Sequence, residues 1–326
     1  MNQGFWKKLK EKSKKQKRPI LALAPMANVT DAAFRRMFVK YGKPDVIWTE
    51  FVSCDGLCSE GKEKLMLDLI FHKSEKPIVA HFFGAKPENF YKCAKLAKEM
   101  GFDGIDINMG CPDRGVLRQG AGSALILKPK LAQKIIKETM RGAGKLPVSI
   151  KTRIGFNEIE FKKWIPNLLK MNLAALTIHG RTKKEMSDVP AHWDVIGEVV
   201  KMRNKMKLKT LIIGNGDVVS LADAQEKYEK YGVDGVMVGR GVFGTPWFFN
   251  PKRKNVSLKT RLKMALEHTK LFEKIFGSKK HFDIMKKHYK AYVSGFNNVK
   301  KIRMKLMMVG GLEKAKKTLL KLIKNS

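Results

Sequence analysis

The chain has 326 residues, of which 44% are hydrophobic, and this length and composition suit a globular protein with a substantial core. Four cysteines are too few for a disulfide scaffold, and no stretch approaches the roughly 18 apolar residues of a membrane span, so we expect a soluble protein of the reducing cytoplasm. The 66 Lys and Arg residues against 30 Asp and Glu residues give a formal net charge of +36, which attracts polyanions such as nucleic acid.

This charge is unevenly distributed along the chain. Residues 1–18 hold eight basic residues and one acidic residue, and residues 251–326 hold 22 basic and four acidic residues. A lysine bias throughout the genome is the alternative explanation of the net charge. We expect residues 1–18 to form a basic extension that is mobile in isolation. The run KKQKRPILALAPMA resembles a signal peptide, but its basic lead is too long and its apolar run too short.

Eight short runs rich in β-forming residues follow this extension, and segments with helical apolar spacing separate them. Nearly continuous apolar strands that alternate with amphipathic helices indicate buried parallel strands. Eight such units in about 230 residues predict a (β/α)8 TIM barrel, whereas a doubly wound sheet would carry a G-x-G-x-x-G motif after its first strand, which is absent here. The predicted strands span residues 19–26, 45–51, 77–84, 104–110, 147–155, 175–181, 211–217 and 235–241.

Beyond Pro251 the pattern consists of helices alone, separated by glycines. We therefore expect a barrel domain over residues 19–250 and a small basic helical domain over residues 251–326. Cys54 and Cys58 form a C-x3-C pair without a second pair or a His cluster at metal-ligand spacing, so no metal site is predicted.

Polar and reactive side chains occur at nearly every predicted strand end, where TIM barrels carry their active sites. His179 alone would more often be a core histidine, and Lys151 alone could be a charge on the rim, but together the set describes one pocket. The strand ends in question carry Pro25, Met26, Ala27, Glu50, His81, Asn108, Cys111, Lys151, Arg153, His179, Arg181, Asn215, Gly216, Asp217, Gly239 and Arg240.

The last two strand ends indicate a phosphate site. GNGD (214–217) and GRGVFGTP (239–246) supply glycines, which let the backbone approach an anion, and Arg240 can pair with it. Lys151 at the fifth strand could face the electron-rich edge of a flavin ring. These features suggest FMN, although a phosphorylated sugar substrate without flavin remains an alternative on these grounds.

Several longer motifs resemble those of the tRNA-dihydrouridine synthases, which are FMN barrels followed by a helical RNA-binding domain, and the closest likeness is to the bacterial type. The motifs cover almost the whole chain in the family's order, and the GCP segment followed by GAGSAL is highly specific. They are APMANVTDAAFR (24–35), DINMGCPDRGVLRQGAGSALI (106–126), VSIKTRIG (148–155), TIHGRT (177–182), GNGD (214–217), VGRGVFGTPWFF (238–249) and KKHYKAYVSG (286–295).

The resemblance implies a division of roles among these residues. Cys111 would be the proton donor, Asn108 would lie beside both flavin and uracil, and NADPH would be the electron donor. The implied FMN-binding residues are Pro25, Met26, Ala27, His81, Asn108, Lys151, His179, Asn215, Gly216, Asp217, Gly239 and Arg240.

Three positions depart from the family pattern. His81 stands where the third strand usually carries Gln beside the flavin, although it can still donate one hydrogen bond. Asn28 replaces the common Gly after PMA, and residues 113–115 replace a more usual basic pair.

Cys111 has the chemistry that dihydrouridine formation requires. Reduced flavin delivers hydride to C6 of uracil, and C5 must then receive a proton. A thiol with its ordinary pKa of about 8.5 is mostly protonated at neutral pH and can supply that proton. A buried structural thiol is the alternative interpretation.

The net charge predicts a polyanionic partner, and the resemblance implies that this partner is tRNA; we expect a monomeric enzyme. A stacked uracil must be drawn into the pocket, with shape and backbone contacts dominating recognition. A dihydroorotate dehydrogenase-like enzyme of free pyrimidines and a non-enzymatic RNA-binding protein are the rival hypotheses. The candidate RNA-contacting residues are Asn108, Arg114, Arg118, Arg181, Lys286, Lys287, His288 and Lys290.

Overall fold

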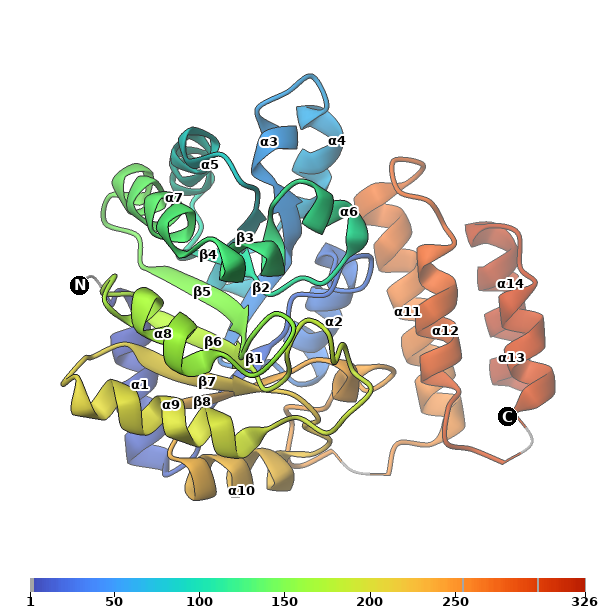
Figure 1. The fold of residues 1–326 in the computed structure, drawn as a ribbon. Coiled ribbons are helices and arrows are strands. Elements are labelled where there is room, and N and C mark those ends of the chain that lie inside the picture. The colour runs from blue at the N-terminus through green and yellow to red at the C-terminus, as the bar shows by residue number, and fades with distance from the viewer. Residues whose placement is uncertain (1–2, 254, 298, 326) are drawn as a thin grey trace.

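The computed structural model describes residues 3–253, 255–297 and 299–325. Eight parallel strands form a closed barrel in the order β1 to β8, and β1 pairs with β8 to complete it (Figure 1). The strands are β1 (Ile20–Leu23), β2 (Val46–Ser53), β3 (Ile78–Phe83), β4 (Gly104–Met109), β5 (Val148–Arg153), β6 (Ala175–His179), β7 (Leu211–Asn215) and β8 (Gly235–Val238). Every strand lies within or beside its predicted range, which confirms the predicted (β/α)8 barrel.

Helices surround the barrel and bury the outward faces of its strands (Figure 1). Sequence signals define their ends: the Asp31 side chain accepts the N–H of Phe34 at the start of α2, and Gly232 ends α10 in a left-handed conformation. The helices of this part are α2 (Ala32–Tyr41), α3 (Cys54–Leu57), α4 (Lys62–Met66), α5 (Pro87–Glu99), α6 (Arg114–Arg118), α7 (Pro129–Ala143), α8 (Phe161–Leu169), α9 (Trp193–Lys205) and α10 (Leu221–Tyr231).

The amino-terminal segment is not a mobile extension, which corrects the expectation from its charge. Residues Phe5–Gln16 form α1, and Trp6 on this helix is 1% exposed. Its ring lies 5.9 Å from that of Trp48 on β2, in a cluster with inward-facing strand residues such as Ile213. The lysines of α1 point outward while Trp6 closes the amino-terminal end of the barrel.

Four helices follow the barrel and lie together on one side of it (Figure 1). They are α11 (Leu258–Phe276), α12 (Ile284–Tyr292), α13 (Lys300–Met307) and α14 (Leu312–Lys324). Their apolar side chains form a core of their own that also includes Ala33 and Met37 of α2. The helical part is therefore packed on the barrel through α2. None of the helices in the described ranges is long and apolar enough to cross a membrane.

Candidate active site

A cavity of about 640 Å³ opens at the carboxyl-terminal ends of the strands. This is the end of a TIM barrel at which active sites form. Its walls include most of the residues predicted to bind a cofactor, namely Pro25, Met26, Lys151, His179, Asn215, Gly216, Asp217, Gly239 and Arg240. They also include residues that the sequence analysis did not assign to the cofactor site, namely Ala24, Pro112, Arg153, Arg181, Met186, Ser187, Val218, Val219 and Gly241.

The loops after β7 and β8 form one wall of this cavity, and their glycines are needed for its shape. Gly216 has φ +131°, and a Cβ there would lie 2.6 Å from the Cβ of Ala191. A Cβ on Gly241 would lie 2.3 Å from the carbonyl oxygen of Val218. A side chain at Gly216 would clash with the segment before α9, and one at Gly241 would clash with the loop after β7, so the glycines let these segments pack closely along the cavity wall.

Asp217 joins two arginines at this wall. Its Oδ2 pairs with the Arg181 guanidinium, and its Oδ1 lies 3.2 Å from Arg240 Nη2. Partial burial acts to raise the pKa of Asp217, but the hydrogen bond from Arg181 and the nearby charges hold it below its ordinary value. The side chain of Arg240 is 62% exposed, which leaves most of its guanidinium available to an anion.

Arg181 does not reach the surface as the sequence analysis expected of an RNA contact. It is 3% exposed, and its Nε donates to the carbonyl of Val189 at 2.5 Å. Its Nη1 lies 3.2 Å from His179 Nε2. These contacts and the pair with Asp217 occupy the guanidinium, so the structure places Arg181 within the cavity wall.

His179 is a neutral imidazole in this environment. Burial lowers its pKa well below the ordinary value, and the charges of Lys151, Arg153 and Arg181 lower it further. Because a guanidinium only donates, Nε2 of His179 accepts from Arg181 and the ring proton resides on Nδ1.

Lys151 presents an uncompensated ammonium group to the cavity. Burial, and then the charge of Arg153, lowers its pKa to about 8. In the described ranges Lys151 is not paired directly with a carboxylate, although the charge of Asp106 on the neighbouring strand offsets part of the lowering of its pKa. A buried cation without a partner favours an anionic or electron-rich ligand. Lys151 lies in register with Asn108 of β4, so the two side chains enter the same region.

Cys111 follows β4 in a loop that is fixed from both sides. Asn108 Oδ1 accepts the backbone N–H of Gly110 at 3.1 Å and that of Cys111 at 2.9 Å. The Cys111 carbonyl accepts the N–H and the hydroxyl of Ser123, each at 3.0 Å. Gly122 has φ +61°, and a Cβ there would lie 2.8 Å from that carbonyl. These contacts explain why the GCP segment is accompanied by GAGS.

Pro112, the residue after Cys111, lines the cavity, so the Cys111 loop reaches its edge, whereas the Cys111 side chain itself is partly buried against Phe83, Val116 and Ala121. Burial raises the pKa of this thiol above its ordinary value, with a smaller opposing effect of the Asp113 backbone. Arg153 supports the same loop by donating from Nε to the Gly110 carbonyl at 2.8 Å. Arg153 follows Lys151 by two residues on β5, so strand periodicity places both on one face.

Comparisons with known proteins identify the family of this chain. A model of the dihydrouridine synthase (Dus) family matches residues 22–326. The chain is 39% identical over 319 residues to a probable tRNA-dihydrouridine synthase of Staphylococcus aureus (strain MRSA252), over 97% of this chain and 94% of that one. It is 39% identical over 310 residues to the probable tRNA-dihydrouridine synthase 2 of Bacillus subtilis (strain 168), over 94% and 93% of the two chains. The chain belongs to the dihydrouridine synthase family.

More distant structures share the barrel of this dihydrouridine synthase family member. Histamine dehydrogenase from Rhizobium sp. 4-9 superposes with a TM-score of 0.55 at 11% identity, over 77% of this chain and 49% of that chain. An old yellow enzyme homologue from Zymomonas mobilis gives 0.51 at 14% identity, over 74% and 92%. At these identities the likeness shows the fold alone.

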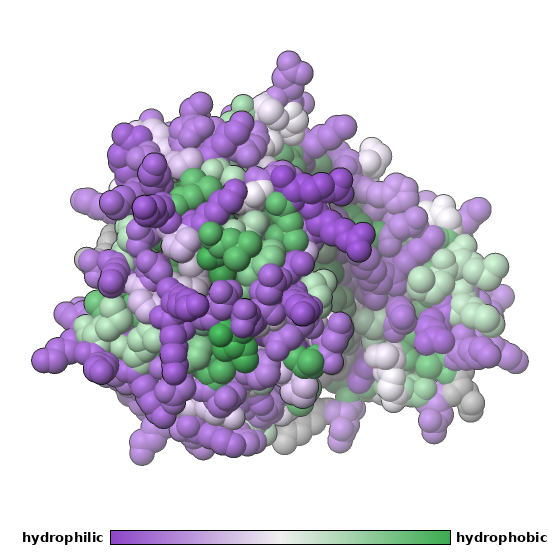
Figure 2. Space-filling view, viewed as in Figure 1, coloured by the Kyte–Doolittle hydropathy of each residue, from purple (hydrophilic) through white to green (hydrophobic). Residues whose placement is uncertain are grey.

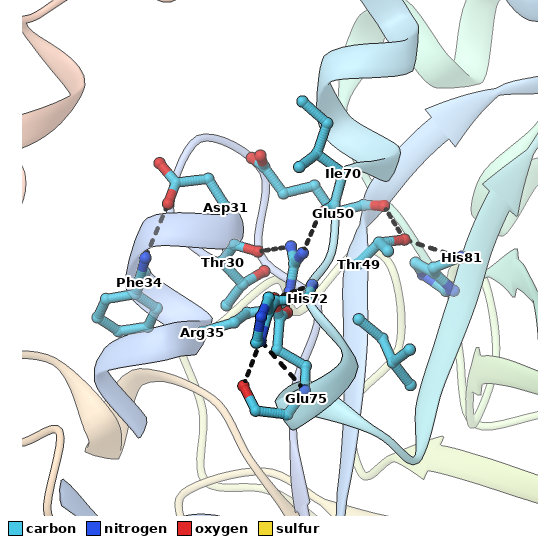
Figure 3. A network of polar contacts seen from close by, with 12 residues as sticks. Thr30, Asp31, Phe34, Arg35, Thr49, Glu50, Ile70, His72, Glu75 and His81 are labelled. Carbon is cyan, nitrogen blue, oxygen red and sulfur yellow. Dashed lines mark hydrogen bonds and ion pairs between the residues drawn. The ribbon is translucent and has the colours of Figure 1, made fainter. Parts of the chain in front are cut away.

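His81, where this family usually has Gln, is not among the residues that line the cavity, and its assignment to the flavin site stays a prediction. It is 1% exposed, and its Nδ1 lies 2.7 Å from Asp106 Oδ2, although neither atom is aligned for a hydrogen bond. Its backbone N–H donates to Thr49 at 3.1 Å (Figure 3). Ala27 and Asn108, also predicted to bind the flavin, do not contribute to the cavity wall either.

Asn28, the second departure from the family pattern, has a local backbone reason. Its φ is +55°, a left-handed conformation that glycine adopts freely and that Asn tolerates better than most residues. Its N–H donates to Glu50 Oε1 at 2.5 Å. The loop after β1 therefore keeps the shape that a glycine would give it.

A buried ion pair beneath this loop was missed by the sequence analysis. Arg35 of α2 and Glu75 are both fully buried, with Nε and Oε2 2.6 Å apart (Figure 3). The guanidinium also donates to the carbonyls of Thr30 and Ile70, at 2.8 and 2.5 Å. A buried arginine needs such a full set of partners. The pair braces the loops after β1 and β2 against each other.

The candidate RNA-contacting residues differ in accessibility. Arg114 and Arg118 on α6 and Lys287 and Lys290 on α12 are exposed, whereas Lys286 is half-buried and pairs with Asp283. Figure 2 shows hydrophilic side chains along the recess between the barrel and the helical part.

His288 cannot be a surface contact, which corrects its prediction. It is fully buried, with its ring 4.8 Å from that of Phe34 and 4.6 Å from that of His268. Burial lowers its pKa to about 3, so the ring is neutral. His288 belongs to the interface between α2 and the helical part.

Proposed function

We propose that this protein reduces the C5–C6 double bond of uridine in tRNA to 5,6-dihydrouridine, with FMN as its cofactor and NADPH as the electron donor. The observation that supports this most strongly is the fixed Cys111 loop at the edge of a cavity into which Lys151 presents an unpaired cation. Family membership supplies the reaction class, and these residues supply its chemistry.

The residues at the cavity fit a flavin mononucleotide. Lys151 would contact the electron-rich part of the ring, while Pro25 and Met26 would line the ring. The loops at Gly216 and Gly239, together with Arg240, would hold the phosphate, because close backbone and an exposed guanidinium suit an anion. When bound and reduced, FMN supplies the hydride that C6 accepts.

Cys111 completes the reduction by donating its proton to C5 of the uracil. One hydride and one proton are then added across the double bond, and the thiolate regains a proton from solvent. The raised pKa of Cys111 keeps the thiol protonated at neutral pH, which a proton donor requires. Asn108, Ser123 and Arg153 act by holding the loop that carries this thiol.

The RNA would bind across the recess between the barrel (residues 19–250) and the basic helices (residues 251–326). We propose that Arg114, Arg118, Lys287 and Lys290 contact phosphates, since they are exposed on the elements beside that recess. A monomer acting in the cytoplasm fits this proposal.

The test is mass spectrometry of dihydrouridine in unmodified tRNA incubated with the purified protein, FMN and NADPH. Wild-type protein should form dihydrouridine, and Cys111→Ala should form little, while Cys58→Ala serves as the control because that thiol is exposed and lies outside the cavity. Reduction of free uracil or dihydroorotate in place of tRNA would instead support a free-pyrimidine enzyme. Full product yield from Cys111→Ala would refute the role of this thiol.

A further inference from the structure

Lys280 connects the helical part to the mouth of the barrel. It lies in the segment between α11 and α12, and its Nζ is 2.7 Å from Glu50 Oε2 and 2.7 Å from Asp68 Oδ1. The side chains of Lys280 and Glu50 are only 10% and 4% exposed. A lysine from one part of the chain is thus enclosed by carboxylates from the other.

Glu50 reaches this position because β2 is irregular near its end. The pairing of β2 with β3 shifts register between Trp48 and Phe51, and such irregularities redirect side chains. Figure 3 shows Glu50 extending from β2 toward the loop that carries Thr30 and Asp31, away from His81. The carboxylate therefore lies beneath the loop after β1.

The second oxygen of Glu50 holds that loop. Its Oε1 accepts the N–H of Asn28 at 2.5 Å, and Pro25 and Met26 just before it line the cavity. Met26 is fixed further by its N–H, which donates to Thr30 Oγ1 at 2.9 Å. Contacts thus run without a gap from Lys280 through Glu50 to the cavity wall.

The charge of Lys280 favours the ionised form of Glu50 over the protonated one. Burial raises the pKa of Glu50 to about 7 even though the charge of Lys280 opposes the rise, and Asp31 and Asp68 add to it. Asp31 is itself 1% exposed, and burial raises its pKa. Without Lys280, three carboxylates would share a buried site with no ammonium group among them, so Glu50 would take up a proton.

A second ionic contact between the two parts provides a comparison. Lys40 of α2 lies 2.6 Å from Glu267 of α11, but these side chains are 58% and 35% exposed. Exposed pairs contribute little, whereas breaking a buried pair leaves an uncompensated charge. The contact at Lys280 is therefore the one whose loss would disturb the loop.

We propose that Lys280 is a positioning residue that fixes the loop Pro25–Asn28 through Glu50, and so aligns the flavin ring that this loop would line with the uridine and Cys111 once RNA has docked on the helical part. This rests on the proposed function. Lys280 itself contacts neither cofactor nor the reacting atoms in this assignment. Its loss should therefore reduce the rate of reaction of bound tRNA and leave tRNA affinity largely intact.

The experiment compares Lys280→Met with Lys279→Met, which removes the same charge from an exposed neighbour in the same segment. For each full-length variant, tRNA affinity, the single-turnover rate of dihydrouridine formation and amide hydrogen exchange of the peptide containing Asn28 are measured. Lys280→Met should lower the rate at least about tenfold, as misalignment does, and should raise exchange at Asn28, while its tRNA affinity stays within about twofold of that of Lys279→Met.

Two further variants keep the proposal testable if Lys280→Met does not fold. Glu50→Gln retains an oxygen for the Asn28 N–H but loses the charge that Lys280 pairs with, and Lys280→Arg retains the cation. Glu50→Gln should slow the reaction, and Lys280→Arg should recover part of the wild-type rate.

Different outcomes distinguish the proposed function from the coupling, by which we mean the effect of Lys280 on the loop Pro25–Asn28 through Glu50. If wild-type protein forms no dihydrouridine, the proposed function fails, and the exchange at Asn28 still decides whether Lys280 holds the loop. Equal rates and equal exchange in Lys280→Met and Lys279→Met would overturn the coupling. Weakened tRNA binding with an unchanged rate would make Lys280 an RNA contact and would overturn it equally.

Discussion

Asn108 Oδ1 accepts the backbone N–H of Cys111 at 2.9 Å, and this contact sets the direction of the loop that carries the thiol. The same oxygen accepts the N–H of Gly110, so the amide closes a turn immediately after β4. Asn108 therefore shapes the backbone that places the proposed proton donor.

Replacing Asn108 with Ala should slow dihydrouridine formation, because the loop loses both acceptor contacts. We expect a decrease of about 10- to 100-fold in the single-turnover rate, the size that small misplacements produce. Ser123 supports the loop from its other side. Ser123→Ala should have a smaller effect on the rate, because the backbone N–H at position 123 still donates to the Cys111 carbonyl. Flavin content is measured in each variant, and an Asn108→Ala rate equal to wild type at full flavin content would contradict this role.

The pH dependence of the reaction should report the raised pKa of Cys111. The proton donor must be protonated, so a pKa raised by burial extends activity to higher pH. With flavin reduced beforehand and saturating, dihydrouridine formation should stay constant through the ordinary thiol pKa of about 8.5 and fall only above it. The pKa of Lys151 is lowered to about 8, so this side chain loses its charge in the same pH range and would then hold the flavin less tightly. Flavin occupancy is therefore measured at each pH. If the rate of dihydrouridine formation falls with a midpoint below the ordinary thiol pKa while flavin occupancy stays constant, the prediction is wrong.

Lys151→Met should reduce flavin retention, because it removes the unpaired cation from the cavity while keeping the aliphatic stem. We expect the purified variant to be colourless or weakly yellow. Lys163→Met, at an exposed position on α8, provides the matched control and should retain the flavin of the wild type. Full flavin occupancy in Lys151→Met would show that the ring is held elsewhere.

The barrel was predictable because buried parallel strands are short apolar runs whose order in the chain is also their order in space. The glycine loops and Cys111 were predictable because barrel topology brings strand ends together. Side-chain contacts between residues from distant segments were not predictable in this way. His288 has the helical neighbours of a surface residue, yet Phe34 and His268 enclose it. The contact of His81 with Asp106 on the next strand is a further pairing of this kind.

Trp6 shows the same limit in the amino-terminal segment. Five of the seven residues after it are lysine or glutamate, which favours a solvated segment, and only the hydrophobic interior end of the barrel explains its burial. The composition of a segment therefore does not reveal a single anchoring side chain.

Trp6→Ala should destabilise the protein by about 3–5 kcal/mol, the usual cost of removing a buried aromatic ring. The shift in the urea midpoint, followed by circular dichroism, measures this loss. Lys8→Ala, at an exposed position on the same helix, should change stability by less than about 0.5 kcal/mol. A Trp6→Ala midpoint equal to that of Lys8→Ala would mean that α1 does not stabilise the barrel.

The basic face of α12 can be tested without removing the helical part. A chain ending near residue 250 would expose Ala33 and Met37 of α2, which the helices cover, so truncation would confound RNA binding with aggregation. Replacing Lys287 and Lys290 with Ala leaves that interface intact, since both side chains are exposed.

The double variant should bind tRNA more weakly than wild type, and its affinity should depend less on salt. Each phosphate contact that is lost lowers the slope of log affinity against log salt by roughly 0.7–0.9, so two lost contacts should lower it by about 1.4–1.8. Lys134→Ala with Lys137→Ala removes the same charge from α7 on the far side of the barrel and serves as the control (Figure 1). Equal slopes for the two double variants would mean that α12 makes no phosphate contacts, and recognition would then depend on the rim of the barrel at α6.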